Sequence, residues 1–162
     1  MIRFWLIGFI FFTACQKPNN TIDSENKTEK LQLSISDFSI NDNQLILNLS
    51  DGSTQTFSLE SSEVEILISP DSQKLAVNER IMSNLQITHS YILNESTGKI
   101  IHKNESTQLW DKIENVKKIN SDEIISPRTN ALNWQGDSLQ IQLQGRLESG
   151  QSLDTIFTIT LN

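Results

Sequence analysis

The chain has few residues of the kinds that most often carry chemistry. Its one cysteine, Cys15, leaves no disulfide possible within the chain, so a fold in an oxidising compartment would be held by burial alone. The 13 lysines and arginines are outnumbered by 20 acids, which argues against nucleic acid, because phosphate binding needs clustered cations. His89 and His102 are the only histidines, and no G-x-S-x-G motif is present. We therefore expect no catalytic site, metal or cofactor, and two unpaired surface histidines, with His89 facing solvent.

The first fifteen residues have the parts of a secretory signal. Arg3 supplies a positive start, positions 4–12 are almost all apolar, and Thr13-Ala14 places small residues before Cys15. The apolar run is about nine residues, which at ~1.5 Å per residue is too short to span a ~30 Å hydrocarbon core. We expect residues 1–14 to be a cleaved signal peptide.

Phe12-Thr13-Ala14-Cys15 resembles the lipobox of bacterial lipoproteins, in which the signal is cut just before the cysteine. The resemblance implies that Cys15 carries a diacylglycerol on its sulfur and an acyl group such as palmitate on its new amino terminus. Two or three such chains anchor a protein to a membrane. Gln16 stands where an aspartate commonly signals inner-membrane retention, so the resemblance also implies an outer-membrane anchor.

Residues 15–30 have the composition of a lipidated, flexible tether. They contain one large apolar residue, Ile22, and cannot bury enough surface to offset the entropy cost of ordering. A coil of this length would span on the order of 20 Å. We expect the rest of the chain, residues 31–162, to form a single β domain.

Within residues 31–162 apolar and polar residues alternate, as they do in half-buried strands of an antiparallel sheet. The alternation is clearest in two sets: Leu45, Leu47 and Leu49, and Leu139, Ile141 and Leu143. Asp51-Gly52 predicts a tight hairpin turn, for which it supplies positive φ angles. Asn41-Asp42-Asn43 has oxygens of the kind that calcium prefers, but such triplets are more often plain turns.

Three stretches resemble hairpins of WD40-like β-propeller blades. Ile68–Val77 is similar to the strand–SPDG–strand element of such blades, Ser90–Ile101 to the outer hairpin, and Leu132–Ile141 to a degenerate second copy of the first. However, Asp71 and Asp137 are 66 residues apart, whereas blades recur roughly every 40–45 residues, and a ring needs at least four blades. We expect blade-like hairpins rather than a closed propeller.

Positions 106–119 have the periodicity of a helix. Leu109, Ile113 and Val116 recur at i, i+4 and i+7, and the Ser106 hydroxyl can cap the first turn. The sequence therefore predicts an all-β fold, an antiparallel meander or sandwich of short strands, with one short helix near 106–119.

Few residues stand out as candidate binding groups. Trp110 and Trp134 form the possible binding surface, since an exposed tryptophan is a recognition anchor, although a buried one is the commoner case. Glu63 and Glu65 share one strand face, as any solvated pair of acids would. Asn, Gln, Ser and Thr number 59 of the 162 residues, so the polar strand faces are largely uncharged and are suited to binding glycans or another strand edge.

These features favour a non-enzymatic lipoprotein. We expect an outer-membrane-anchored β domain that faces the periplasm and binds a protein of the cell envelope, with strand edges available for β addition. The alternative is a glycan- or small-ligand-binding module or an unrecognised envelope hydrolase. It requires a pocket that contains Trp110 or Trp134 beside acids with perturbed pKa values. The negative charge alone suggests a third function, inhibition of a cationic host enzyme such as lysozyme.

Overall fold

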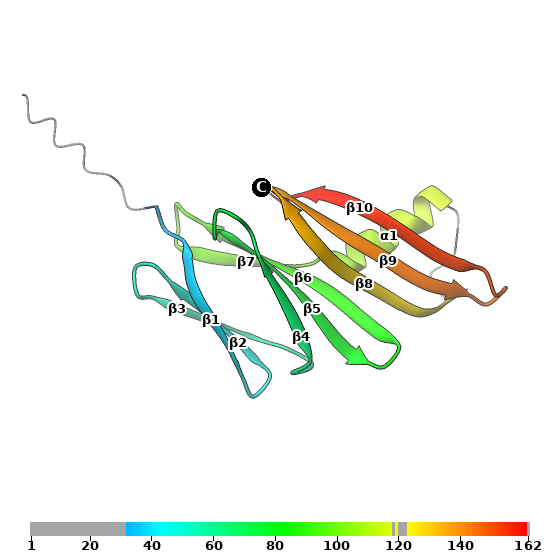
Figure 1. The fold of residues 1–162 in the computed structure, drawn as a ribbon, viewed down its shortest axis with the longest axis horizontal. Helices are drawn as coiled ribbons and strands as arrows, with labels where there is room; N and C mark the ends of the chain where they lie inside the picture. The colour runs from blue at the N-terminus through cyan, green and yellow to red at the C-terminus, as the bar shows by residue number, and fades with distance from the viewer. Residues whose placement is uncertain (1–31, 118, 120–122, 162) are drawn as a thin grey trace, which may run out of the picture. The chain divides into compact units, whose positions relative to one another are not determined.

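The computed structural model describes residues 32–117, 119 and 123–161, so the predicted signal peptide, Cys15 and the predicted tether lie outside the described residues. No helix in the described part of the chain is long and apolar enough to cross a membrane. The strands and the helix follow one another in this order (Figure 1): β1 Ile35–Asn41, β2 Gln44–Leu49, β3 Thr54–Ser58, β4 Val64–Ile68, β5 Lys74–Met82, β6 Leu85–Asn94, β7 Lys99–Asn104, α1 Glu105–Lys117, β8 Ile124–Gln135, β9 Ser138–Leu147 and β10 Ser152–Thr160.

The strands form three antiparallel meanders. β1, β2 and β3 make a small sheet, and the other strands make a larger sheet in the order β10-β9-β8-β6-β5-β4, with β7 also paired to β6. Within the larger sheet the second meander, β4–β7, and the third, β8–β10, meet where Gln86 of β6 pairs in parallel with Arg128 of β8. The sheets are open and curled, and the predicted all-β meander or sandwich with one short helix is confirmed.

The central strands β5 and β6 are covered on both faces. One face packs against the β1–β3 sheet and forms the first core, which includes Leu47, Val77 and Tyr91. The other face forms the second core with α1 and the β8–β10 meander. Six consecutive residues of β5 and six of β6 are therefore buried, as in strands that have no solvent face.

The predicted turns lie where the sequence indicates, with one difference in detail. The β1–β2 turn is plain, with positive φ at Asp42 and Asn43. In the β2–β3 hairpin only Gly52 has a positive φ, at 85°. Asp51 contributes its carboxylate instead, which accepts hydrogen bonds from the Ser53 N–H at 2.9 Å and hydroxyl at 2.6 Å. The expectation of positive φ at both positions is therefore wrong for Asp51.

Two of the blade-like hairpins meet at their turns. Lys74 begins β5 and is only 7% exposed. Its ammonium lies 3.3 Å from the carboxylate of Asp71 in the β4–β5 turn and 2.6 Å from that of Asp137 in the β8–β9 turn. Burial opposes the charged lysine, but the hydrogen bonds that its ammonium donates to the carboxylates of Asp137 and Asp71 outweigh burial and raise the pKa of Lys74. This contact ties the second meander to the third.

Candidate functional site

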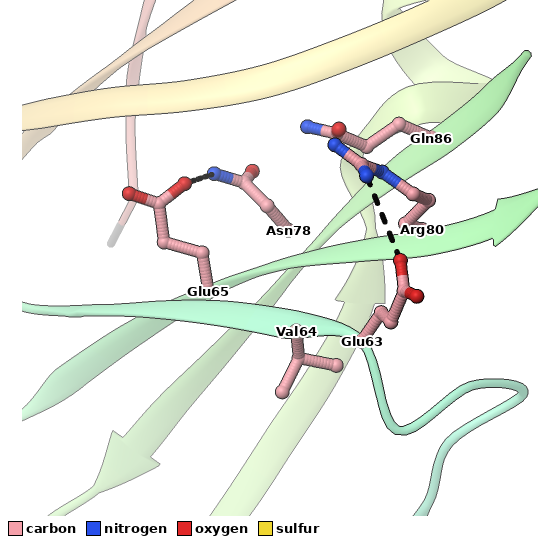
Figure 2. Close-up of a pocket in the computed structure, with 6 residues that line it drawn as sticks. All are labelled: Glu63, Val64, Glu65, Asn78, Arg80 and Gln86. Atoms are coloured by element: carbon pink, nitrogen blue, oxygen red, sulfur yellow. Dashed lines mark hydrogen bonds and ion pairs between the residues drawn. The ribbon is translucent and has the colours of Figure 1, made fainter. Parts of the chain in front are cut away.

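Two adjoining hollows open where β4 begins and β5 ends, and they share the side chains of Glu63 and Arg80. The first has a volume of about 270 Å³, is drawn in Figure 2, and is lined by Glu63, Val64, Glu65, Asn78, Arg80 and Gln86. The second has a volume of about 400 Å³ and is lined by Ser61, Ser62, Glu63, Arg80, Ile81, Met82 and Ser83. We call these lining residues together the Glu63–Arg80 surface.

Strand register brings the polar groups of this surface together. Glu65 of β4 pairs with Asn78 of β5, and Arg80 of β5 pairs with Gln86 of β6. Side chains two residues apart in a strand lie on the same face, so Asn78 and Arg80 point the same way. Glu63 lies just before β4, where its carbonyl accepts a hydrogen bond from the Arg80 N–H at 2.9 Å. One face of three strands therefore supplies most of the charged and amide groups.

The groups of this surface differ in how firmly they are held (Figure 2). The Asn78 amide donates to a Glu65 carboxylate oxygen at 3.3 Å, but it is buried and mainly bound to the backbone of Ala131. A carboxylate oxygen of Glu63 lies 3.6 Å from a guanidinium nitrogen of Arg80, and the two side chains are 70% and 58% exposed. An exposed ion pair of this kind contributes roughly 0–1 kcal/mol, so its two charges are available to other molecules.

The arrangement suits recognition of charged side chains. It offers carboxylates and a guanidinium side by side, so a ligand that carries both signs of charge can replace the internal pair at small cost. Met82, at the rim of the second hollow, is the most exposed large apolar residue among those described, at 61%. Arginine and methionine are enriched in protein interfaces.

The two histidines form a pair, which corrects the expectation of unpaired surface residues. His89 in β6 is only 8% exposed, and its Nδ1 lies 2.9 Å from Nε2 of His102 in β7. His102 is exposed, and its ring stacks on that of Tyr91 with centroids 4.7 Å apart. His89 faces the first core because its neighbours Thr88 and Ser90 are fully buried on the opposite face.

Burial sets the charge of this cluster. Burial first, and then repulsion from His102, lowers the pKa of His89 to about 4, and burial also lowers the pKa of His102. Glu79, whose pKa burial raises, lies 3.5 Å from Nε2 of His89 and accepts the Ser61 N–H at 2.5 Å. Among residues 32–117, 119 and 123–161, no three His, Cys, Asp or Glu side chains are arranged to hold a metal ion.

The two tryptophans have different surroundings. Trp134 of β8 packs on the second core, and its indole N–H donates to the Leu67 carbonyl at 3.1 Å. It therefore joins β8 to β4. Trp110 of α1 also packs on the second core and lines a hollow of about 260 Å³, together with Thr107, Asp111, Ile124 and Pro127. Of the two, Trp110 is the one that the structure places in a hollow.

Sequence reasoning noted Glu63 and Glu65 only as a solvated pair of acids, and it missed Arg80 and Gln86. The signal for Arg80 was present, because the Pro70-Asp71 turn places Ile68 opposite Leu75. Counting five residues back along the chain from Ile68 and five forward from Leu75 places Glu63 opposite Arg80.

Comparison of the chain with protein-family models, with curated proteins and with solved structures finds no match.

Proposed function

We propose that this chain is an outer-membrane-anchored lipoprotein whose β domain is not an enzyme and binds a protein of the cell envelope through the Glu63–Arg80 surface. The observation that carries the binding proposal is the exposed ion pair between Glu63 and Arg80 at the wall shared by two hollows. The anchor rests on the resemblance of Phe12–Cys15 to a lipobox. The domain faces the periplasm.

A protein partner fits this surface better than a small molecule does. Charged, amide and hydroxyl side chains make up most of the lining of both hollows, whereas small-ligand sites are lined mostly by apolar side chains. A partner that presents a cation to Glu63 and an anion to Arg80 would exchange one weak ion pair for two interfacial ones. Met82 supplies exposed apolar area beside these charges. A flexible tether on Cys15 would let the domain reach a partner near the membrane.

The test is a pull-down of the tagged, full-length protein in mild detergent from intact, cross-linked cells. The unmodified chain should capture a partner in stoichiometric amounts. Glu63→Lys should reduce that capture at least tenfold, because it places two cations together and repels the partner's own. Glu148→Lys is the matched control, since Glu148 is an exposed acid in the β9–β10 turn, and it should leave capture unchanged.

Two further variants separate binding from folding and from anchoring. The double variant Glu63→Arg, Arg80→Glu keeps an internal ion pair but inverts its direction, so it should fold normally and still lose the partner. Cys15→Ala should lose palmitate labelling and remain an unprocessed precursor. The binding proposal fails when Glu63→Lys captures as much partner as the control does. Normal palmitate labelling of the Cys15→Ala variant would refute the proposed lipid anchor on Cys15.

The hollow at Trp110 favours a second candidate, a glycan-binding module. An indole beside the Asp111 carboxylate offers a stacking face and a hydrogen-bond acceptor for a sugar. Titration of the full chain with N-acetylglucosamine oligosaccharides, followed by tryptophan fluorescence, tests it. A saturable change that Trp110→Phe removes would support this candidate, and an unchanged spectrum would exclude it.

A further inference from the structure

The outer edge of β10 is the longest regular strand edge among the described residues. β10 lies at one end of the larger sheet (red in Figure 1), and in the described part of the chain only β9 pairs with it. The pairing runs without a register shift from Ser152 opposite Arg146 to Thr160 opposite Ser138. The strand contains no lysine, arginine or proline. Its one acid, Asp154, is held by the amide of Gln142 at 2.8 Å.

The other edge strands have the features that normally prevent pairing. β3 and β4 have five residues each, and short edges are poor templates. β7 has six residues and carries Lys99 and Lys103. β1 has a register shift between Ile35 and Asp37. β10 has nine residues and none of these features, so it is the edge most able to accept another strand.

Hydrogen bonds at both ends of the β9–β10 ladder identify the backbone groups that point outward. The Leu147 N–H donates to the Gln151 carbonyl at 2.8 Å, and the Leu161 N–H donates to the Asp137 carbonyl at 3.1 Å. Because hydrogen-bonded residues alternate along an antiparallel strand, the odd-numbered residues of β10 face β9. The outward groups belong to Ser152, Asp154, Ile156, Thr158 and Thr160, all of which have exposed side chains.

We propose that two copies of this chain pair antiparallel through β10, with Ile156 on the two-fold axis. Ile156 is the midpoint of Ser152–Thr160 and is 55% exposed. Pairing over the full strand would place each Ile156 against its counterpart and bury both. Asp154 would then lie opposite Thr158 of the second copy, so that no like charges oppose each other. A two-fold interface requires such a self-complementary surface, and β10 provides one.

The register can be tested with cysteines in the full-length chain. In the proposed dimer the two Ile156 Cα atoms would be ~5.5 Å apart, as in a hydrogen-bonded antiparallel pair, which is within the range that a disulfide bridges. The two Thr158 Cα atoms would be offset by four residues, or roughly 14 Å. On mild oxidation Ile156→Cys should form a disulfide-linked dimer, while Thr158→Cys and the wild type should not. The wild type is the control for any disulfide-linked dimer that forms through Cys15.

Charge substitutions on the same exposed face provide the second measurement. Ile156→Lys would set two ammonium groups against each other and should weaken dimerisation at least tenfold in sedimentation velocity. Thr158→Lys would set an ammonium against Asp154 of the second copy and should preserve or strengthen the dimer. Equal cross-linking of the two cysteine variants, or a monomeric wild type, would overturn the proposal. The proposal would also be overturned if the chain stayed monomeric and its β10 edge bound a different protein, with that binding lost in both lysine variants.

Discussion

The two faces of the central strands β5 and β6 bury polar residues in different ways. On the first-core face these are Glu79 and His89, which are titratable and interact with His102 and the Ser61 N–H. On the second-core face Asn78, Thr88 and Ser90 meet polar residues of α1 and β8 and bond to them and to backbone groups. We call this set the second-core polar cluster: Asn78, Thr88, Ser90, Glu105, Ser106 and Thr129. The first-core face therefore holds the groups whose pKa burial shifts, and the second-core face links β5 and β6 to α1 and β8.

The second-core polar cluster exists because the larger sheet splits between β6 and β8. Beyond the pair of Gln86 and Arg128 the two strands diverge, and the backbone groups left between them need partners. The Asn78 side chain supplies them by accepting the Ala131 N–H at 2.6 Å and donating to the Ala131 carbonyl at 3.0 Å. Ser106 of α1 similarly accepts the Thr88 N–H at 2.7 Å. Side chains here supply the hydrogen bonds that a continuous β6–β8 ladder would make.

Replacement of Asn78 should have the largest effect on stability. Asn78→Ala leaves the buried N–H and carbonyl of Ala131 without their partners, at a cost of about 1–3 kcal/mol for each group. We expect a loss of about 3 kcal/mol in the free energy of unfolding, measured by urea denaturation at pH 7. Asn133→Ala, at an exposed position of β8, is the control and should change stability by less than about 0.5 kcal/mol. Equal effects of the two variants would show that the split needs no side-chain bridge.

The sequence predicted the outer strands better than the central ones. Leu45, Leu47 and Leu49 alternate because one face of β2 packs on the first core and the other does not. The same reasoning failed at His89, whose neighbours Thr88 and Ser90 are polar. In a strand covered on both faces, polar neighbours mark a polar cluster and not a solvent face. The consecutive apolar residues Tyr91-Ile92-Leu93 were the available signal of burial on both faces.

The candidate site could be predicted only in part, for a related reason. Glu63 and Glu65 are visible as a pair along one strand, but the partner of Glu63 comes from the strand opposite. Arg80 becomes a neighbour only when the register of the β4–β5 hairpin is known. The split between β6 and β8 could not be predicted at all, because it depends on how the third meander packs against the second.

The net pH response of the first-core face should be smaller than the effect of Asn78→Ala, because Glu79 opposes His89, and it tests whether the two faces differ as described. The pKa of His89 is about 4 in the folded protein against 6.5 when unperturbed, so between pH 7 and pH 4 the unfolded chain takes up a proton that the folded protein resists. The contribution of His89 to stability is therefore complete above pH 6.5 and is lost as the pH falls toward 4, by on the order of 3 kcal/mol. Glu79 has a raised pKa in the folded protein, so its protonation at acid pH favours the folded state and partly offsets the loss from His89.

Comparison with His89→Gln measures the contribution of the histidine together with its interaction with Glu79, which lies 3.5 Å away. The stability difference between wild type and His89→Gln, from urea midpoints at pH 7, 5.5 and 4, should shift in favour of the variant as the pH falls. The corresponding difference for Asn78→Ala should change less, since the Ala131 backbone does not titrate and the contact of Asn78 with the Glu65 carboxylate is long, at 3.3 Å. A pH-independent His89→Gln difference would mean that His89 is accessible to protons in the folded state. The two faces would then differ in their bonding but not in their response to acid.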